Sequence, residues 1–210
     1  MAEKGPTPNP DALGIQRGDY NRNLAGPLLL GVGKLISIPL QHWVITSHPL
    51  SSFGIPHPPT DGSVTLPLFG AQPLLPTLFL GMTLTLILKQ NAWLWGYCAE
   101  RLTLPFAVFG VIVPAIYECL CALVFTAAGA NPLWRREFLY AGAALHFLAA
   151  ATELACEVDR ARFKRRKESR GRLYKGGAFG VVRHPNYACN VVYGTAYGFA
   201  AGGPGFAVFS

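Results

Sequence analysis

The sequence predicts an all-α fold, a polytopic transmembrane helix bundle with about five spans. Of the 210 residues, 51% are hydrophobic and only 14% are charged, whereas a soluble domain carries about 25% charged residues. Apolar stretches of roughly 20 residues recur along the chain, and this is the length that crosses a bilayer. Ten of the 18 Lys and Arg residues lie between residues 160 and 183, as a local patch beside a membrane span does.

The elements follow from the positions of the apolar stretches. Residues 1–22 are polar and contain several prolines, so we predict a flexible cytosolic tail. Residues 23–210 are predicted to form a single transmembrane domain with a basic cofactor loop at 159–185. The expected spans are 24–46, 74–88 with an extension to 97, 104–128, 138–156 and 188–209.

The loop charges predict the orientation of these spans. The loop at 48–72 contains no Lys or Arg, whereas the loop at 159–185 is strongly basic. Because positive loops stay on the cytosolic side, we expect the basic loop in the cytosol and the loop at 48–72 on the opposite side. A multi-pass protein of the endoplasmic reticulum membrane is expected if the chain is eukaryotic.

The basic loop leads into the last predicted helix through a turn and a helix start. Gly176-Gly177 permits a tight turn, and Pro185 suits the first position of a helix. The free N–H groups of that first turn, beside Arg183 and His184, form an anion site that suits a cofactor with phosphates or a carboxylate. The alternative is a loop that only orients the protein and attracts anionic membrane lipids. We expect no nucleic-acid partner.

A family resemblance is carried by this same region. The residues concerned are Phe163-Lys164, Arg166, Glu168, Arg170-Gly171-Arg172, Gly177, Phe179 and Arg183-His184-Pro185-Asn186-Tyr187. In these positions the chain resembles the steroid 5-alpha-reductase C-terminal-domain superfamily, in particular its membrane reductase branch. Sterol C14-reductases and isoprenylcysteine carboxyl methyltransferases are related to it. The resemblance covers about 30 residues.

The resemblance implies a cofactor site with NADPH or, as the alternative, S-adenosylmethionine. It assigns cofactor binding to Lys164, Arg166, Arg172, Tyr174, Arg183, His184, Asn186, Tyr187 and Asn190. The reductase pattern has Gly-Glu where this chain has Cys189-Asn190, and the loss of that carboxylate weakens the NADPH assignment. Members of the superfamily continue with a further apolar segment and a polar tail, so a C-terminally truncated member is expected.

Ionisable residues within the predicted spans are candidates for catalysis, because each costs about 2.5–3.5 kcal/mol to insert. Tyr117, Glu118 and Glu153 are the predicted catalytic residues, since a tyrosine beside a carboxylate can transfer a proton. The alternative is mutual neutralisation, of Glu118 by Lys34 and of Glu153 by His146. No metal ligands are expected; we interpret His42, His48 and His57 as solvated or capping residues.

The last helix carries a second polar signal. Asn186, Asn190, Tyr193 and Tyr197 are spaced four, three and four residues apart, so they share one helix face. In a membrane helix such a face points into the bundle or a cavity, and its alternative role is to hold the bundle together by hydrogen bonds.

Three functional hypotheses result from these patterns. The leading one is a membrane oxidoreductase that reduces a C=C bond of a hydrophobic, sterol-like or other lipid substrate with NADPH. The second is an S-adenosylmethionine-dependent methyltransferase of the isoprenylcysteine type. The third is a non-catalytic, truncated member of the fold. The substrate and the oligomeric state are not fixed by the sequence.

Overall fold

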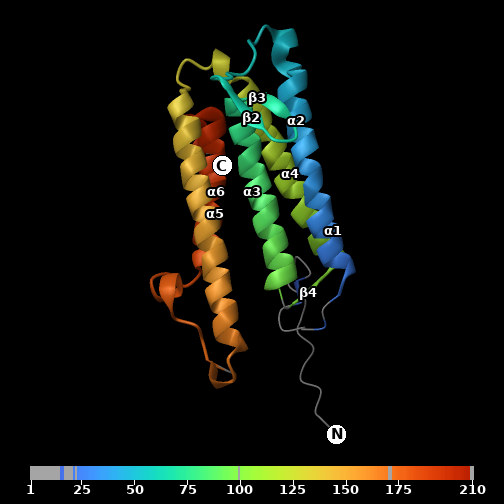
Figure 1. Cartoon of the computed structure of the whole chain (residues 1–210), viewed down its shortest axis with the longest axis vertical. Coiled ribbons are helices and arrows are strands. Elements are labelled where there is room, and N and C mark those ends of the chain that lie inside the picture. The colour runs from blue at the N-terminus through green and yellow to red at the C-terminus, as the bar shows by residue number, and fades with distance from the viewer. Residues whose placement is uncertain (1–14, 17–20, 22, 99, 170–171, 209–210) are drawn as a thin grey trace.

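The protein folds into an elongated bundle of antiparallel helices (Figure 1). A computed structural model describes residues 15–16, 21, 23–98, 100–169 and 172–208. The helices are α1 Ala25–Gly33, α2 Ser37–Ser47, α3 Leu74–Gly96, α4 Leu104–Thr126, α5 Arg136–Arg165, α6 Pro185–Gly202 and α7 Pro204–Ala207. The strands are β1 Ile15–Gln16, β2 Ser63–Leu66, β3 Gly70–Pro73 and β4 Arg101–Leu102. The predicted all-α class is therefore confirmed.

Among the described residues, three helical segments are long and apolar enough to cross a membrane: Ala25–Phe53, Leu104–Thr126 and Arg136–Arg165. Two further long helices, α3 and α6, pack beside them. Since α3 and α4 have 23 residues each, each is about 34 Å long at 1.5 Å per residue, enough for a hydrocarbon core of about 30 Å. The number of five spans stays a prediction.

The first span is one helical segment with a tighter turn in its middle. A 3-10 turn at Lys34–Ile36 joins α1 to α2, and a further 3-10 helix at Pro49–Phe53 extends it. Pro39 has no N–H for the carbonyl group of residue 35. The local 3-10 geometry accommodates this missing bond without ending the segment.

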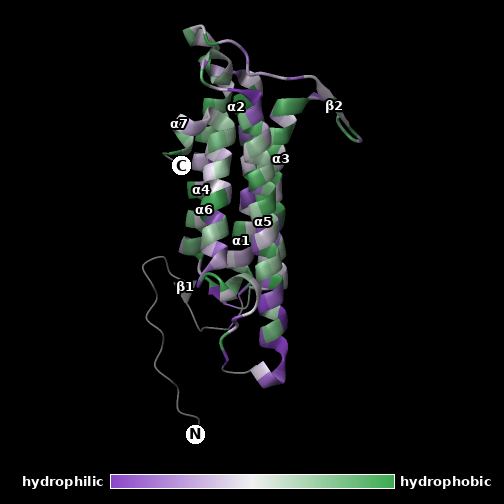
Figure 2. Ribbon diagram, turned by 90° about the vertical axis from the view of Figure 1, so that its left-hand side faces the viewer, coloured by the Kyte–Doolittle hydropathy of each residue, from purple (hydrophilic) through white to green (hydrophobic). Residues whose placement is uncertain are grey.

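Helix α5 is longer than the span expected from its apolar residues. It continues nine residues beyond Cys156, through a stretch rich in charge, to Arg165. Pairs three residues apart stabilise this extension: Glu157 bonds to Arg160, and Asp159 lies 3.8 Å from Arg162. The extension projects from the apolar bundle and appears hydrophilic in Figure 2. The 3-10 turns Lys167–Ser169 and Gly177–Gly180 follow it before α6.

Small residues let α5 and α6 approach closely. A Cβ atom at Gly142 would lie 2.7 Å from the carbonyl oxygen of Ala196 and 2.9 Å from the Cβ atom of Ala200. Ala196 and Ala200 are themselves buried. The close approach holds α6, with its tyrosines, against the centre of the bundle.

The two ends of the bundle differ in character. We call the end that holds β4, the end of α5 and the start of α6 the basic end; the opposite end holds the β2–β3 hairpin (Figure 1). At the basic end, β1 pairs with β4, and Asn23 exchanges two hydrogen bonds with the backbone of Leu102 at 2.6 and 3.1 Å. Most of the predicted tail at 1–22 lies outside the described residues.

Candidate active site

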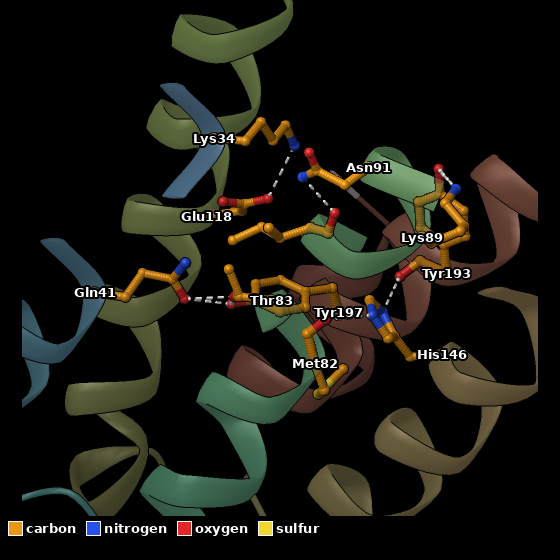
Figure 3. Close-up of polar contacts among 11 residues, drawn as sticks. Lys34, Gln41, Met82, Thr83, Lys89, Asn91, Glu118, His146, Tyr193 and Tyr197 are labelled. Carbon is orange, nitrogen blue, oxygen red and sulfur yellow. Dashed lines mark hydrogen bonds and ion pairs between the residues drawn. The ribbon is translucent and has the colours of Figure 1, made fainter. Parts of the chain in front are cut away.

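A cavity of about 280 Å³ lies within the bundle, between α1 and the adjoining 3-10 turn, α3, α4 and α6. Its lining combines apolar side chains with several polar ones. Polar groups inside a membrane bundle cost free energy, and they usually pair with one another or take part in function. The lining residues are Leu30, Lys34, Leu86, Lys89, Gln90, Phe106, Gly110, Pro114, Tyr117, Glu118, Tyr193, Gly194 and Tyr197. Figure 3 shows most of the polar ones and their partners.

Helix α4 contributes a continuous face to this cavity. Phe106, Gly110, Pro114, Tyr117 and Glu118 line it, at spacings of three, four or one that place them on one side of a helix. Pro114 lies inside the helix and leaves the carbonyl group of Gly110 without its usual N–H donor. The cavity therefore runs along the half of α4 that is nearer the basic end.

Lys34 and Glu118 form an ion pair in the cavity wall, with a distance of 3.6 Å between Nζ and Oε1. Their side chains are 9% and 3% exposed. The other carboxylate oxygen of Glu118, Oε2, is buried without a hydrogen-bond partner. The neighbouring Tyr117 hydroxyl donates to the carbonyl oxygen of Gly194 at 2.9 Å. The sequence-based pairing of Lys34 with Glu118 is thus present in the structure.

A second buried ion pair joins Lys89 to Glu153. The Lys89 ammonium also donates to the Tyr193 hydroxyl at 3.1 Å and lies 4.4 Å from the centre of that ring. Glu153 is therefore neutralised by Lys89, not by His146, which was the expected partner. The structure places Lys89 inside the bundle, because α3 continues for seven more residues beyond it, to Gly96.

His146 holds three helices together through their backbones. Its side chain is fully buried, with Nδ1 3.1 Å from the Tyr193 carbonyl oxygen and Nε2 3.0 Å from the Met82 carbonyl oxygen. A neutral imidazole donates only one hydrogen bond, whereas an imidazolium donates two. The ring thus connects α5 to both α3 and α6 (Figure 3). His146 is not among the residues that line the cavity.

Tyr197 is anchored on the side of the cavity that faces the opposite end. Its hydroxyl donates to Oε1 of Gln41 at 2.5 Å and lies 2.8 Å from the Thr83 hydroxyl. Thr83 also donates to the same Gln41 oxygen at 3.0 Å. The predicted inward face of the last helix is therefore occupied by Tyr193 and Tyr197. Gln41 and Thr83 were not predicted, because single uncharged polar residues are common in membrane helices.

An aromatic and charged cluster lies at the basic end, outside the cavity. Phe163, Tyr174 and Phe179 pack in sequence, with ring centres 5.0 and 5.5 Å apart. The Arg160 guanidinium lies 5.9 Å from the centre of the Phe179 ring and donates to Oε2 of Glu157. Glu157 is 5% exposed, and its second oxygen has no hydrogen-bond partner. Glu157 was not predicted, because it looked like an ordinary residue of a charged stretch.

The structure gathers most of the predicted cofactor residues at this basic end but does not join them into one contact network. Tyr174, Asn186 and Asn190 are half-buried, and the Tyr174 ring packs against Gly176, where a Cβ atom would lie 2.8 Å from it. The His184 and Tyr187 rings are 5.4 Å apart. The predicted cofactor residues that are exposed are Lys164, Arg166, Arg172, Arg183, His184 and Tyr187.

Within the described part of the chain, no group of three or more His, Cys, Asp or Glu side chains is arranged to hold a metal ion. His48 is buried rather than solvated, in a left-handed conformation at the end of α2. Its Nε2 atom lies 2.9 Å from the carbonyl oxygen of Ile55. It therefore has the expected capping position.

The family model described as "Protein of unknown function (DUF1295)" matches residues 91–202, just over half of the chain. The chain belongs to the DUF1295 family. This family is related to the membrane superfamily of steroid 5-alpha-reductases and methyltransferases. The matched region includes Tyr117, Glu118, Glu153 and the whole basic end from α5 to α6, whereas Lys34 and Lys89 lie before it.

This DUF1295 protein is also similar to a protein named "Probable O-methyltransferase ustE" from Ustilaginoidea virens, with 36% identity over 119 residues. The similarity covers 56% of the chain and 41% of the relative, so the chain corresponds to less than half of that protein's length. No solved structure matches. Together, the family and the relative support a membrane enzyme.

Proposed function

We propose that the protein is a membrane-bound O-methyltransferase that takes its methyl group from S-adenosylmethionine. The cofactor binds at the basic end, and a hydrophobic substrate enters the cavity from the bilayer. The similarity to a protein named as a probable O-methyltransferase supports this choice. The structural observation that carries it is the buried carboxylate of Glu157, whose second oxygen lacks a partner beside the basic loop.

The residues at the basic end fit the chemistry of this cofactor. S-adenosylmethionine has a carboxylate, for which the exposed Arg172 and Arg183 are suitable donors. It also has an ammonium group and ribose hydroxyls, which need acceptors, and the free oxygen of Glu157 is one. The aromatic residues Phe163, Tyr174 and Phe179 offer faces for the adenine ring and the sulfonium cation. When bound, the cofactor supplies an electrophilic methyl group.

The chain's own residues would bring an oxygen nucleophile to that methyl group. The cavity has a predominantly apolar lining, which suits a lipid-like substrate, as most small-molecule sites have apolar walls with few polar groups. Tyr117 and Glu118 provide a hydroxyl and a carboxylate within it. Lys89 and Glu153 lie on the other side, next to Tyr193, where their mutual pairing keeps that wall neutral.

An NADPH-dependent reductase is the second candidate, and one observation favours it. The exposed cations at and beyond the end of α5, among them Lys164, Arg166 and Arg172, are numerous enough for a pyrophosphate and a ribose phosphate together. The buried carboxylate of Glu157 opposes this candidate, because it would repel a phosphate group placed beside it. We therefore rank the methyltransferase first.

The test is equilibrium binding of S-adenosylmethionine and of NADPH to purified protein in detergent. Wild type is compared with Glu157→Gln and with Glu137→Gln, a matched change of an exposed acid on the same helix at the opposite end. A hydrogen bond to a charged group contributes about 1.5–3 kcal/mol. We therefore expect Glu157→Gln to weaken S-adenosylmethionine binding about tenfold or more and Glu137→Gln to leave it unchanged.

Thermal unfolding of each variant shows whether Glu157→Gln is still folded, since it removes the partner of Arg160. Phe179→Leu provides a second variant, which removes an aromatic face but no charge. It should also weaken the binding of S-adenosylmethionine. Saturable NADPH binding without S-adenosylmethionine binding would refute the methyltransferase. Equal affinities of wild type and Glu157→Gln for S-adenosylmethionine would show that Glu157 does not contribute to the cofactor site.

A further inference from the structure

We propose that the cavity binds an uncharged alcohol or phenol, whose O–H group donates a hydrogen bond to Oε2 of Glu118. The proposal rests on the proposed methyltransferase function and names its substrate class: the methyl acceptor is a hydroxyl group, not a carboxylate. It depends on three features of the cavity wall, namely the unpartnered oxygen, the balance of charge and the apolar lining.

The first feature is the missing donor at Glu118. Oε2 of Glu118 is buried and without a hydrogen-bond partner, while the whole residue is only 2% exposed. Lys34 approaches the other oxygen, at 3.6 Å. A buried carboxylate oxygen without a donor costs free energy, and Glu118 lines the cavity. A ligand that donates a hydrogen bond would remove this cost.

The other hydroxyl groups of the lining already have partners. Tyr117 donates to the Gly194 carbonyl oxygen and Tyr193 accepts from Lys89. Tyr197 is bonded to Gln41 and Thr83 (Figure 3). Among the buried side-chain oxygens and nitrogens of the described lining residues, Oε2 of Glu118 alone has no partner. The unpartnered buried oxygen of the lining therefore calls for a donor.

The second feature is the balance of charge. Each of the two lysines in the lining is already paired, Lys34 with Glu118 and Lys89 with Glu153. The remaining polar residues of the lining are uncharged. An entering carboxylate would lose its hydration and add a negative charge to a wall whose two lysines are each already paired with a carboxylate, which is costly in a low-dielectric interior. A neutral hydroxyl avoids that cost, and its bond to a carboxylate is a strong, charge-assisted one.

The third feature is the size and polarity of the space. A volume of about 280 Å³ is just below the range of about 300–1,000 Å³ typical of small-molecule sites, so it suits a small ligand. Leu30, Leu86 and Phe106 form its apolar walls. A compact ring system with one hydroxyl group fits both requirements.

The same contact defines the role of Glu118 in methyl transfer. The O–H bond of the substrate breaks and its proton passes to Oε2 of Glu118. The substrate oxygen would then bond to the electrophilic methyl group that S-adenosylmethionine supplies when bound, and the electron pair of the C–S bond would leave with the sulfur. Lys34 acts as a positioning residue, because it holds the Glu118 carboxylate through its other oxygen.

The experiment measures direct binding, without cofactor, of three probes that differ in one group: 1-naphthol, 1-methoxynaphthalene and 1-naphthoate at pH 7. Wild type is compared with Lys34→Met/Glu118→Met, which replaces the buried pair by apolar side chains of similar size and therefore leaves no unpaired charge. We expect wild type to bind naphthol at least tenfold more tightly than either other probe. In the double variant, naphthol should bind no better than methoxynaphthalene.

Glu157→Gln separates this inference from the proposed function. Glu157→Gln should weaken the binding of S-adenosylmethionine and leave the affinity for naphthol unchanged. The double variant should weaken the binding of naphthol and leave the affinity for S-adenosylmethionine unchanged. Naphthoate binding as tight as naphthol binding would overturn the proposal, and so would undiminished naphthol binding by the double variant. Selective naphthol binding without any S-adenosylmethionine binding would refute the methyltransferase but not the assignment of the cavity to a hydroxyl compound.

Discussion

Buried charged residues set this bundle apart from one with a purely apolar interior. Lys89 and Glu153 are 10% and 14% exposed at their side chains, and Tyr193 bonds to the same lysine. A buried pair of this kind gives little net stability, yet removal of one partner leaves an uncompensated charge. The asymmetry between single and double replacement therefore reveals whether the pair is buried in the membrane-embedded protein.

Lys89→Met should destabilise the protein by about 3 kcal/mol, because the Glu153 carboxylate is left buried without its cation. Lys89→Met/Glu153→Met should recover most of that loss. The measurement is thermal unfolding in detergent, where about 1 kcal/mol shifts the midpoint by roughly 2–4 °C in a chain of this size. A double variant as unstable as the single one would show that the two side chains do not interact.

Charges in the middle of apolar stretches were recognisable from the sequence. Lys34 and Glu118 stand out in this way, and the alternative in which they neutralise each other is present in the structure, whereas a catalytic role of Glu118 stays a prediction. Lys89 lies near the end of its apolar stretch, where a lysine more often marks the membrane edge. Its pairing with Glu153 depends on how α3 packs against α5, which the sequence alone does not show. Glu157 was missed for a related reason: its burial depends on α5 continuing past the apolar region.

At the scale of elements, the contact between α5 and α6 positions the tyrosines of the cavity wall. Gly142 is the point of closest approach, where a Cβ atom would lie 3.0 Å or less from three atoms of α6. Two of these are backbone atoms, a carbonyl oxygen and an amide nitrogen, so a rotamer change of a side chain cannot relieve the clash.

Gly142→Ala should therefore lower the unfolding midpoint, since α5 and α6 must separate to fit the methyl group. Gly81→Ala is the matched control. Gly81 also lies within a helix, but nothing stands within 4 Å of a Cβ atom there, and alanine favours a helix over glycine by about 0.5–1 kcal/mol. The control should be neutral or slightly stabilising. Equal effects of the two variants would contradict the close packing.

The loop at the opposite end is attached to α5 by an exposed charged contact. Asp61 accepts hydrogen bonds from the Tyr140 hydroxyl at 2.8 Å and from Arg136 at 2.9 Å. The bond from Tyr140, followed by the effect of Arg136, lowers the pKa of the Asp61 carboxyl below its usual value. Asp61 also holds a left-handed backbone conformation, with φ of 48°.

Because the folded-state pKa of Asp61 is lowered, its contribution to stability is present above its unfolded pKa of about 3.9. It is lost as the pH falls through the lower, folded-state value. Amide hydrogen exchange of residues 54–62 should therefore accelerate between pH 5 and pH 3, relative to the intrinsic rate, in wild type. Asp61→Asn should show faster exchange already at pH 5 and little further change. Identical pH profiles for the two proteins would show that the contact does not hold the loop.

The helices were predicted more completely than the contacts between elements. All five long apolar segments form helices, because hydrophobicity and length determine them locally. The β2–β3 hairpin was read as part of a loop, since Ser63–Leu66 is short and its partner strand begins at Gly70. The aromatic packing of Phe163, Tyr174 and Phe179 was also not foreseen, because it depends on how the chain folds back after α5.

At the scale of the whole molecule, the distribution of charge predicts an orientation in the membrane. The basic end and the loop at 48–72 lie at opposite ends of the bundle (Figure 1). Only the basic end carries a dense cluster of Lys and Arg residues, so we expect it to face the cytosol. The cofactor residues proposed above lie at that end and would then be accessible to a cytosolic metabolite.

Protease protection tests this orientation. In sealed microsomes, a tag inserted in the 48–72 loop should be protected from added protease, while a tag near Lys167 should be cleaved. Detergent should make both tags accessible, which controls for tags that resist cleavage. The opposite pattern in sealed vesicles would overturn the arrangement.

Transfer of a labelled methyl group tests the central claim most directly. Membranes containing the wild-type chain, the chain with Glu157→Gln, or no chain are incubated with S-adenosylmethionine that carries a trideuterated methyl group, and hydrophobic compounds are extracted for mass spectrometry. We predict at least one extracted compound that gains a trideuteromethyl ether with wild type, and much less of it with Glu157→Gln or without the chain. NADPH-dependent saturation of a C=C bond, with no labelled methyl product, would contradict the account.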